Sequence, residues 1–176
     1  MANVFSPEIF PYNKENKDLL EAASSGDIPR LLDSIKRGAT EINCALRFAA
    51  QAGHIDLLPI LMDHGANDYA NALVWAAKIK RVDIIDLMIE KGANNYNFAM
   101  SFAASEGHLD IVKMMMRLGA DNYGSSLCSA ISTGQIDVVQ FLLTIDCNYD
   151  YDYLINIAKP DIATILTIYK EGKVKL

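Results

Sequence analysis

Three histidines and three cysteines are the residues with which this chain could bind a metal ion or attack a substrate as a nucleophile. A metal site needs three or four ligands that converge on one ion. The histidines are His54, His64 and His108, and the cysteines are Cys44, Cys128 and Cys147. None of them has the short spacing of a metal-binding motif, and an odd number of cysteines leaves no closed set of disulfides. We therefore expect no metal site.

Sequence motifs of common catalytic sites are also absent. The chain contains no phosphate-binding glycine-rich loop, no His-Glu-x-x-His and no Gly-x-Ser-x-Gly. Aspartates recur singly rather than in pairs, at Asp56, Asp83, Asp110 and Asp137. They therefore form no acid–base pair, and no motif places a histidine or an acid beside a cysteine to activate its thiol. We predict that the protein is not an enzyme and uses no cofactor.

The spacing of these aspartates belongs to a repeat of 27 residues. The dipeptide Gly-Ala marks the repeat at Gly38-Ala39, Gly65-Ala66, Gly92-Ala93 and Gly119-Ala120, and an Ala-Ala pair keeps the same interval at Ala22-Ala23, Ala49-Ala50, Ala76-Ala77 and Ala103-Ala104. Such self-similarity is typical of a solenoid, in which each unit buries its apolar face against its neighbours. His54 and His108 are two units apart, roughly 20 Å at the usual spacing of packed helices, which is too far to share a metal ion.

Each unit contains two helical patterns joined by a turn. In the first pattern, Leu46, Ala49 and Ala50 have the spacing of one buried helix face, and the alanines allow neighbouring helices to approach closely. The second pattern begins with one of the aspartates, which is favourable at a helix N-terminus, and it ends at the glycine of Gly-Ala. Larger apolar residues such as Ile111, Val112 and Met115 occupy its buried face. These patterns predict an all-α fold.

The segment from Met100 to Ala120, with its Ala-Ala pair, Gly-His turn and Gly-Ala end, resembles the ankyrin repeat. The resemblance covers about residues 15–148, with a degenerate sixth unit to roughly residue 171. It implies an ankyrin-type solenoid of about six stacked helix-turn-helix repeats. It also implies that His54 and His108 form hydrogen bonds and pack within their turns.

Two departures from the family pattern concern the link between units. The Thr-Pro-Leu-His opening is missing, and each unit is six residues shorter than the common ankyrin repeat of 33. The missing residues fall where ankyrin repeats have a β-hairpin finger, so we expect fingers that are shortened or absent. This compact form resembles the repeats that giant DNA viruses of protists encode.

The repeat interval also predicts the domain boundaries. Residues 1–13 form an N-terminal capping segment, in which Phe5, Ile9, Phe10 and Tyr12 fold over the first unit; a linear motif for a partner and plain disorder are the alternatives. The solenoid covers residues 14–171, with units near 14–40, 41–67, 68–94, 95–121 and 122–148 and a degenerate unit at 149–171. Residues 172–176 form a tail. Cys147 replaces the alanine of Gly-Ala, and we expect it to be buried.

Composition indicates where the protein acts. A net charge of −6 argues against a general affinity for nucleic acid or an anionic membrane. No apolar stretch approaches the roughly 18 residues of a transmembrane helix, and the first residues do not resemble a signal peptide. We expect a soluble, intracellular and cytoplasmic protein, in the host cytoplasm if it is viral, and we favour a monomer.

The resemblance implies a non-catalytic protein–protein interaction module, an adaptor or scaffold that binds a partner through the concave face of its first helices. If the protein is viral, the partner is a host protein. The alternative is a structural or self-assembling repeat protein without a dedicated foreign partner. Polar, closed ends would favour the first hypothesis.

The candidate partner-binding residues lie where the units differ from one another and at the turn of the third unit. They are Arg47, Gln51, Asn71, Val74, Trp75, Lys78, Ile79, Lys80, Arg81, Phe98, Ser101, Ser105 and Glu106. The aromatic residues Phe48, Trp75 and Phe102 share one position, which in the family packs inward. Tyr69, Tyr96 and Tyr123 form a further column at the links, where their rings either cover the edge of the next unit or contact a partner.

The third unit has Lys80-Arg81 where its neighbours have Gly-His. Lys80 must therefore adopt a left-handed conformation or reshape the turn. Together with Lys78, these residues form a basic cluster that either is a solvated turn or anchors an acidic segment of the partner. We expect charge reversal at Lys78 and Arg81 to weaken partner binding more than reversal at Lys113 and Arg117.

Overall fold

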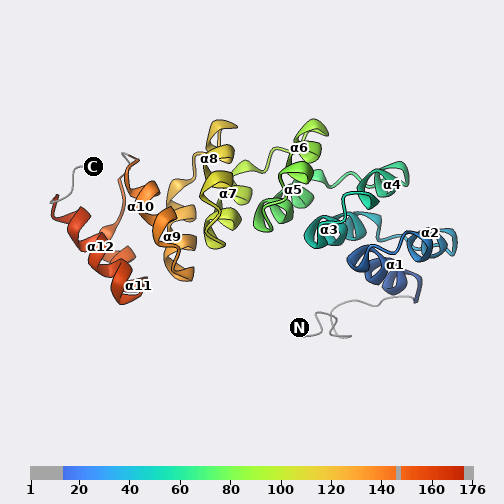
Figure 1. Ribbon diagram of the computed structural model, residues 1–176, viewed down its shortest axis with the longest axis horizontal. Helices are drawn as coiled ribbons and strands as arrows, with labels where there is room; N and C mark the ends of the chain where they lie inside the picture. The colour runs from blue at the N-terminus through green and yellow to red at the C-terminus, as the bar shows by residue number, and fades with distance from the viewer. Residues whose placement is uncertain (1–13, 146–147, 173–176) are drawn as a thin grey trace. The chain divides into compact units, whose positions relative to one another are not determined.

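The computed structural model describes residues 14–145 and 148–172, which form twelve α-helices and no strand (Figure 1). The helices are α1 (Lys14–Ser25), α2 (Ile28–Lys36), α3 (Ile42–Ala52), α4 (Leu57–Asp63), α5 (Tyr69–Lys78), α6 (Val82–Glu90), α7 (Tyr96–Ser105), α8 (Leu109–Arg117), α9 (Tyr123–Thr133), α10 (Ile136–Leu143), α11 (Tyr151–Ile157) and α12 (Pro160–Lys170). The predicted all-α fold of about six helix pairs is confirmed. The predictions for Phe5, Ile9, Phe10, Tyr12 and Cys147 concern positions outside the described residues.

The chain divides into two compact units, one ending at Ala72 and the other beginning at Leu73. In the first unit, α1 packs against α2 and α3, and α3 packs against α4. The fully buried leucines Leu19, Leu46 and Leu58 come from three of these helices and form its core. In this unit the first helices of successive repeats, α1 and α3, are in direct contact.

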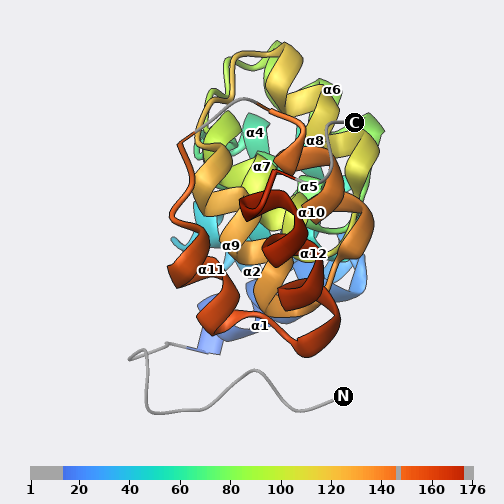
Figure 2. The ribbon, with the colours of Figure 1, turned by 90° about the vertical axis from the view of Figure 1, so that its left-hand side faces the viewer.

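The second unit contains two layers of helices. The first helices α7 and α9 are in contact, as are α9 and α11, while the second helices α8, α10 and α12 form the other layer. Figure 2 views this unit from its C-terminal side, with α9 and α11 on one side and α10 and α12 on the other. Between the layers, Met100, Val112, Met115 and Leu127 are fully buried. The paired alanines Ala103 and Ala104 are also fully buried, as the close approach of first helices requires.

The Gly-Ala dipeptide ends the second helix of each of the first four repeats, α2, α4, α6 and α8. It does so through one hydrogen-bonding pattern. After α4, the N–H of Gly65 donates to the carbonyl of Met62 and the N–H of Ala66 donates to that of Leu61, each at 2.9 Å. This is the Schellman arrangement, which requires a left-handed residue, and Gly65 has φ 95°. The alanine is 2 % exposed because it packs inward as the chain leaves the helix. Both residues of the repeated dipeptide are thus explained.

In place of β-hairpin fingers, asparagine side chains hold three of the links between successive repeats. The Asn43 Oδ1 accepts the N–H groups of Asn67 at 2.7 Å and Asp68 at 3.0 Å, while its Nδ2 donates to Asn67 Oδ1 at 3.1 Å. Asn97 holds Asp121 and Asn122 in the same way. A third equivalent residue, Asn16, binds the backbone of residues 40 and 41. We call this arrangement the asparagine clamp; the sequence analysis did not identify it.

Candidate functional site

The turn histidines form hydrogen bonds within the fold, as the family resemblance implied. The Nε2 of His54 lies 3.1 Å from the carbonyl oxygen of Ser24, and the Nε2 of His108 lies 3.0 Å from that of Lys78. A carbonyl only accepts, so in each ring Nε2 is the protonated donor. Each bond joins a turn to the first helix of the preceding repeat, 30 residues earlier. These ring nitrogens therefore hold neighbouring repeats together.

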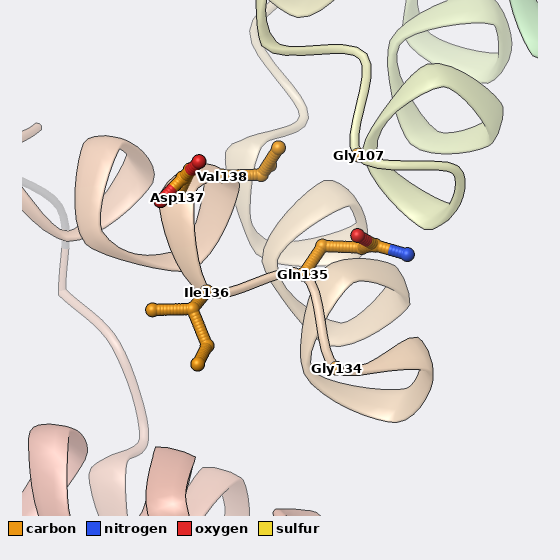
Figure 3. A pocket seen from close by; sticks show the side chains of 6 residues that line it. All are labelled: Gly107, Gly134, Gln135, Ile136, Asp137 and Val138. Atoms are coloured by element: carbon orange, nitrogen blue, oxygen red, sulfur yellow. The ribbon is translucent and has the colours of Figure 1, made fainter.

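In the fifth repeat, Gln135 takes the place of the histidine. Its Nε2 donates to the carbonyl of Ser105 at 3.2 Å, and Figure 3 shows the side chain extending beside Gly107. A Cβ at Gly107, where φ is 79°, would lie 2.5 Å from the Gln135 Oε1. The left-handed backbone therefore favours glycine, and a side chain at this position would displace the amide group of Gln135. The hollow of about 160 Å³ at this turn, lined partly by Ile136 and Asp137, belongs to the same repeat-to-repeat contact.

Lys80 occupies the turn position where the first, second, fourth and fifth repeats have glycine. Its φ of 59° is left-handed, and it is the one residue other than glycine with a positive φ in the described parts of the chain. The first of the two predicted alternatives is therefore correct. The strain of such a conformation is about 1 kcal/mol. The side chain turns toward Asp110 of the next repeat, with Nζ 3.0 Å from the carboxylate.

The cations of the predicted basic cluster each have a carboxylate within the second unit. Lys78 lies 3.5 Å from Glu106, and Arg81 lies 2.6 Å from Asp83. The hydrogen bonds from Arg81 hold the pKa of Asp83 below its ordinary value. At Asp110, partial burial raises the pKa, but the hydrogen bond and charge of Lys80 together with backbone hydrogen bonds hold it below its ordinary value. The cluster is thus neutralised by the chain itself, and a partner's carboxylate would have to replace these contacts.

Aromatic rings also engage Lys78. Its Nζ lies 5.2 Å from the ring centroid of Trp75 and 5.9 Å from that of Phe102, within cation–π range. The two rings are 5.9 Å apart and tilted by 57°. Phe102 and Trp75 are half-buried, as is Phe48 at the equivalent position in the first unit, so each ring keeps part of its surface accessible.

Phe98 on α7 is the large apolar side chain that the described residues expose most, at 64 %. It borders a small hollow of about 70 Å³ between α7 and α9, together with Asn97, Ser101, Asn122 and Ser125. Ser101 is tied to the neighbouring helix, because its hydroxyl oxygen lies 3.1 Å from that of Ser126. An exposed aromatic ring therefore lies against a helix of small polar side chains.

The other predicted partner-binding residues differ in how much surface they offer. Val74 is only 6 % exposed, so it contributes almost nothing to the surface. Asn71 is exposed and donates to Asp68 at 2.7 Å, while the guanidinium of Arg47 lies 4.5 Å from the Phe48 ring centroid. Half-buried positions are occupied by Gln51, Tyr69, Ile79, Tyr96, Ser105 and Tyr123, and Glu106 is exposed. Arg47, Gln51, Tyr69 and Asn71 belong to the first unit, and the rest of the predicted set belongs to the second.

Two cysteines are described, and neither has the surroundings of a reactive thiol. Burial raises the pKa of Cys128, and both burial and a hydrogen bond to Glu41 raise that of Cys44. The Sγ of Cys44 lies 3.3 Å from the Glu41 carboxylate. A raised pKa keeps a thiol protonated and unreactive at neutral pH.

The part of the chain that the structure describes offers neither a metal-binding group nor a membrane-spanning helix. The described residues contain no group of three histidine, cysteine or acidic side chains that could hold a metal ion. None of their helices combines the length and the apolar character needed to span a membrane.

Comparison with known proteins assigns the chain to a family. A family model described as ankyrin repeats, in three copies, matches residues 19–99 and again residues 93–153. No curated protein matches the chain. The ankyrin matches together cover more than half of the sequence, and they agree with the helix pairs, Gly-His turns and Gly-Ala caps described above. The chain belongs to the ankyrin-repeat family.

Proposed function

We propose that this protein is an adaptor or scaffold without catalytic activity, and that it binds another protein through the face of its first helices. Ankyrin repeats are general protein–protein interaction modules and are typically non-catalytic. We place the centre of the contact on α7 and α9 of the second unit, at Phe98.

The exposure of Phe98 is the observation that carries this proposal. A phenylalanine that is 64 % exposed buries little apolar surface in the free protein. Covering its ring by a partner would remove that surface from water, at roughly 25 cal/mol for each Å² of apolar area. Interface hot spots are commonly such aromatic anchors surrounded by polar groups that exclude water.

Helix α9, which borders the hollow beside Phe98, supports this role. One and two turns beyond Ser125 on this helix, Ser129 and Ser132 direct their hydroxyl protons to carbonyls of their own helix, at 3.0 and 2.8 Å. Their oxygens can still accept hydrogen bonds from a partner. The small side chains also leave room beside the ring. A partner segment with an apolar side chain and nearby donor groups fits this combination.

The basic cluster of Lys78, Lys80 and Arg81 lies in the same unit. In this proposal it helps to select the partner rather than to raise the affinity. Lys78 and Glu106 are partly exposed, so their ion pair contributes little stability and can be exchanged for a partner's carboxylate. Charged groups at the edge of an interface affect association rate and partner choice more than affinity. The resemblance of the short repeat to those of giant DNA viruses leads us to propose a cytoplasmic host protein as the partner.

The test compares capture of proteins by the wild type, by Phe98→Ser and by Val82→Ser. Val82 is 42 % exposed on the second helix α6, so its replacement removes an exposed apolar side chain from another surface. We expect the wild type and Val82→Ser to capture the same partner proteins from host lysate in similar amounts. Phe98→Ser should capture at least tenfold less of these proteins. Purified candidates must then show the same order of affinity. Equal binding by all three proteins would reject the proposed face.

The alternative of a self-assembling protein predicts a different result. Sedimentation of the wild type alone would then show a mass that rises with concentration, and Phe98→Ser would abolish the rise. A monomer at all concentrations, with a foreign partner sensitive to Phe98→Ser, supports the interaction module.

A further inference from the structure

A second surface with unusual composition lies on the outer layer of the second unit. Helix α8 places Lys113, Met116 and Arg117 three and four residues apart, on one face. Phe141 of the adjoining helix α10 completes an open hollow of about 420 Å³. Figures 1 and 2 both place α8 and α10 side by side in the layer of second helices. The hollow is therefore on a different helix layer from Phe98.

The two cations of this hollow have no carboxylate of the described residues within 4.0 Å. This distinguishes them from Lys78, Lys80 and Arg81, each of which has one. These two cations stand on one helix face in a chain whose net charge is −6. Their field is available to an anionic group from outside.

The floor of the hollow is apolar. Met116 and Phe141 are half-buried, and the Nζ of Lys113 lies 4.6 Å from the Phe141 ring centroid. The cation–π contact holds the ammonium group over the face of the ring, where it can still donate to a carboxylate as a second partner. Methionine adapts its shape to the side chain that it contacts. The hollow thus offers an apolar surface with two cations along it.

We infer that this hollow, which we call the α8–α10 site, docks an acidic peptide segment of a partner protein. Carboxylates of the segment bind Lys113 and Arg117, and an aliphatic or aromatic side chain next to them covers Met116 and Phe141. Two cations are few for a nucleic acid, whose binding depends on neutralising many phosphates. A sugar–phosphate backbone is charged and polar, so it would gain nothing from contact with the apolar floor. An acidic segment that carries an apolar side chain uses both features.

A random library of displayed 12-residue peptides provides the probe. It is selected against the immobilised wild-type chain, and the enriched peptides are synthesised with a fluorescent label. Fluorescence anisotropy then measures their affinity for the wild type, for the double variant Lys113→Gln with Arg117→Gln, and for Phe141→Ser. Circular dichroism and thermal unfolding confirm that each variant is folded.

We expect enriched peptides with at least two acidic residues beside an apolar one. The double variant and Phe141→Ser should each bind them at least tenfold more weakly, and higher salt should weaken binding to the wild type. The matched controls are Lys113→Arg with Arg117→Lys, which keeps both charges, and Val82→Ser on helix α6; both should bind within about twofold of the wild type. Phe98→Ser is measured as well, to detect peptides that bind the face of the first helices.

Several outcomes overturn the inference. Enriched peptides without acidic residues, no enriched peptides at all, or binding that is unchanged in the double variant would each reject the α8–α10 site. Peptides that lose affinity in Phe98→Ser but not in the double variant would assign binding to the first-helix face and leave the proposed function intact. A labelled single-stranded oligonucleotide that binds more tightly, with the same dependence on Lys113 and Arg117, would replace the peptide by a nucleic acid.

Discussion

Replacing Asn97 by alanine tests whether the asparagine clamp holds the link between α8 and α9. The Oδ1 of Asn97 accepts the N–H groups of Asp121 at 2.8 Å and Asn122 at 2.9 Å, and its Nδ2 donates to the Asp121 side chain at 3.0 Å. Alanine removes all three contacts and leaves the backbone of the helix unchanged.

The expected loss of stability follows from opposing terms. Each backbone hydrogen bond contributes about 0.5–1.5 kcal/mol net. Asp121 and Asn122 are exposed, so water replaces part of this loss, and alanine is a better helix former than asparagine by up to about 0.7 kcal/mol. We expect Asn97→Ala to lower the free energy of unfolding by about 1 kcal/mol. Asn16 is only 8 % exposed, so Asn16→Ala should cost about 2 kcal/mol because the amide of Asn16 itself is more shielded from water than that of the half-buried Asn97.

Amide hydrogen exchange measures the effect where it arises, which matters because repeat proteins can open locally. A loss of about 1 kcal/mol corresponds to roughly fivefold faster exchange at the amides of Asp121 and Asn122. Asn156 is exposed on α11 and forms no such clamp, so Asn156→Ala is the control in both exchange and urea unfolding. Unchanged exchange at the two amides, or equal stability of the two variants, would refute the clamp.

Two further predictions concern Lys80 and Asp18. Lys80→Gly should be about 1 kcal/mol more stable to urea than Lys80→Ala, because both lose the ion pair with Asp110 and only glycine relieves the left-handed strain; equal stabilities would contradict this. Hydrogen bonds from Arg30 and Arg37 hold the pKa of Asp18 below its ordinary value, so the folded state binds the proton more weakly than the unfolded chain. The resulting stability is present above the ordinary pKa of aspartate and is lost as the pH falls below about 4. Asp18→Asn should therefore lose less stability than the wild type between pH 7 and pH 3, and equal losses in thermal unfolding would argue against the network.

The fold could be predicted from the sequence because its main determinants are local and repeat. Glycine past a helix end and paired alanines on a helix face each have one physical reason to recur at the same interval. The position of Lys80 in the repeat predicted either a left-handed residue or a reshaped turn, and its positive φ is the first of these. The same regularity placed His54 and His108 in the turns.

The contacts between neighbouring repeats were harder to predict. The ion pairs of Lys78 with Glu106 and of Lys80 with Asp110 join residues 28 and 30 positions apart, so they cross from one repeat to the next. A cluster that looks basic along the sequence is therefore neutral in space. The asparagine clamp was missed for a related reason, since its partners lie 24 and 25 residues later. The high exposure of Phe98 depends on the small side chains of α9, which lie in the following repeat.

The short reach of these contacts has a consequence for the speed of folding. Clamp and turn hydrogen bonds close loops of 24 to 30 residues. Loop-closure entropy grows with the logarithm of length, so the longest of these loops costs only about 0.2 kcal/mol more to close than the shortest. A contact between residues about 150 positions apart would cost roughly 1.5 kcal/mol more than one across 27. Each repeat can therefore dock on its predecessor at nearly the same entropic cost, and folding should be fast for a chain of this length because no step waits for distant segments to meet.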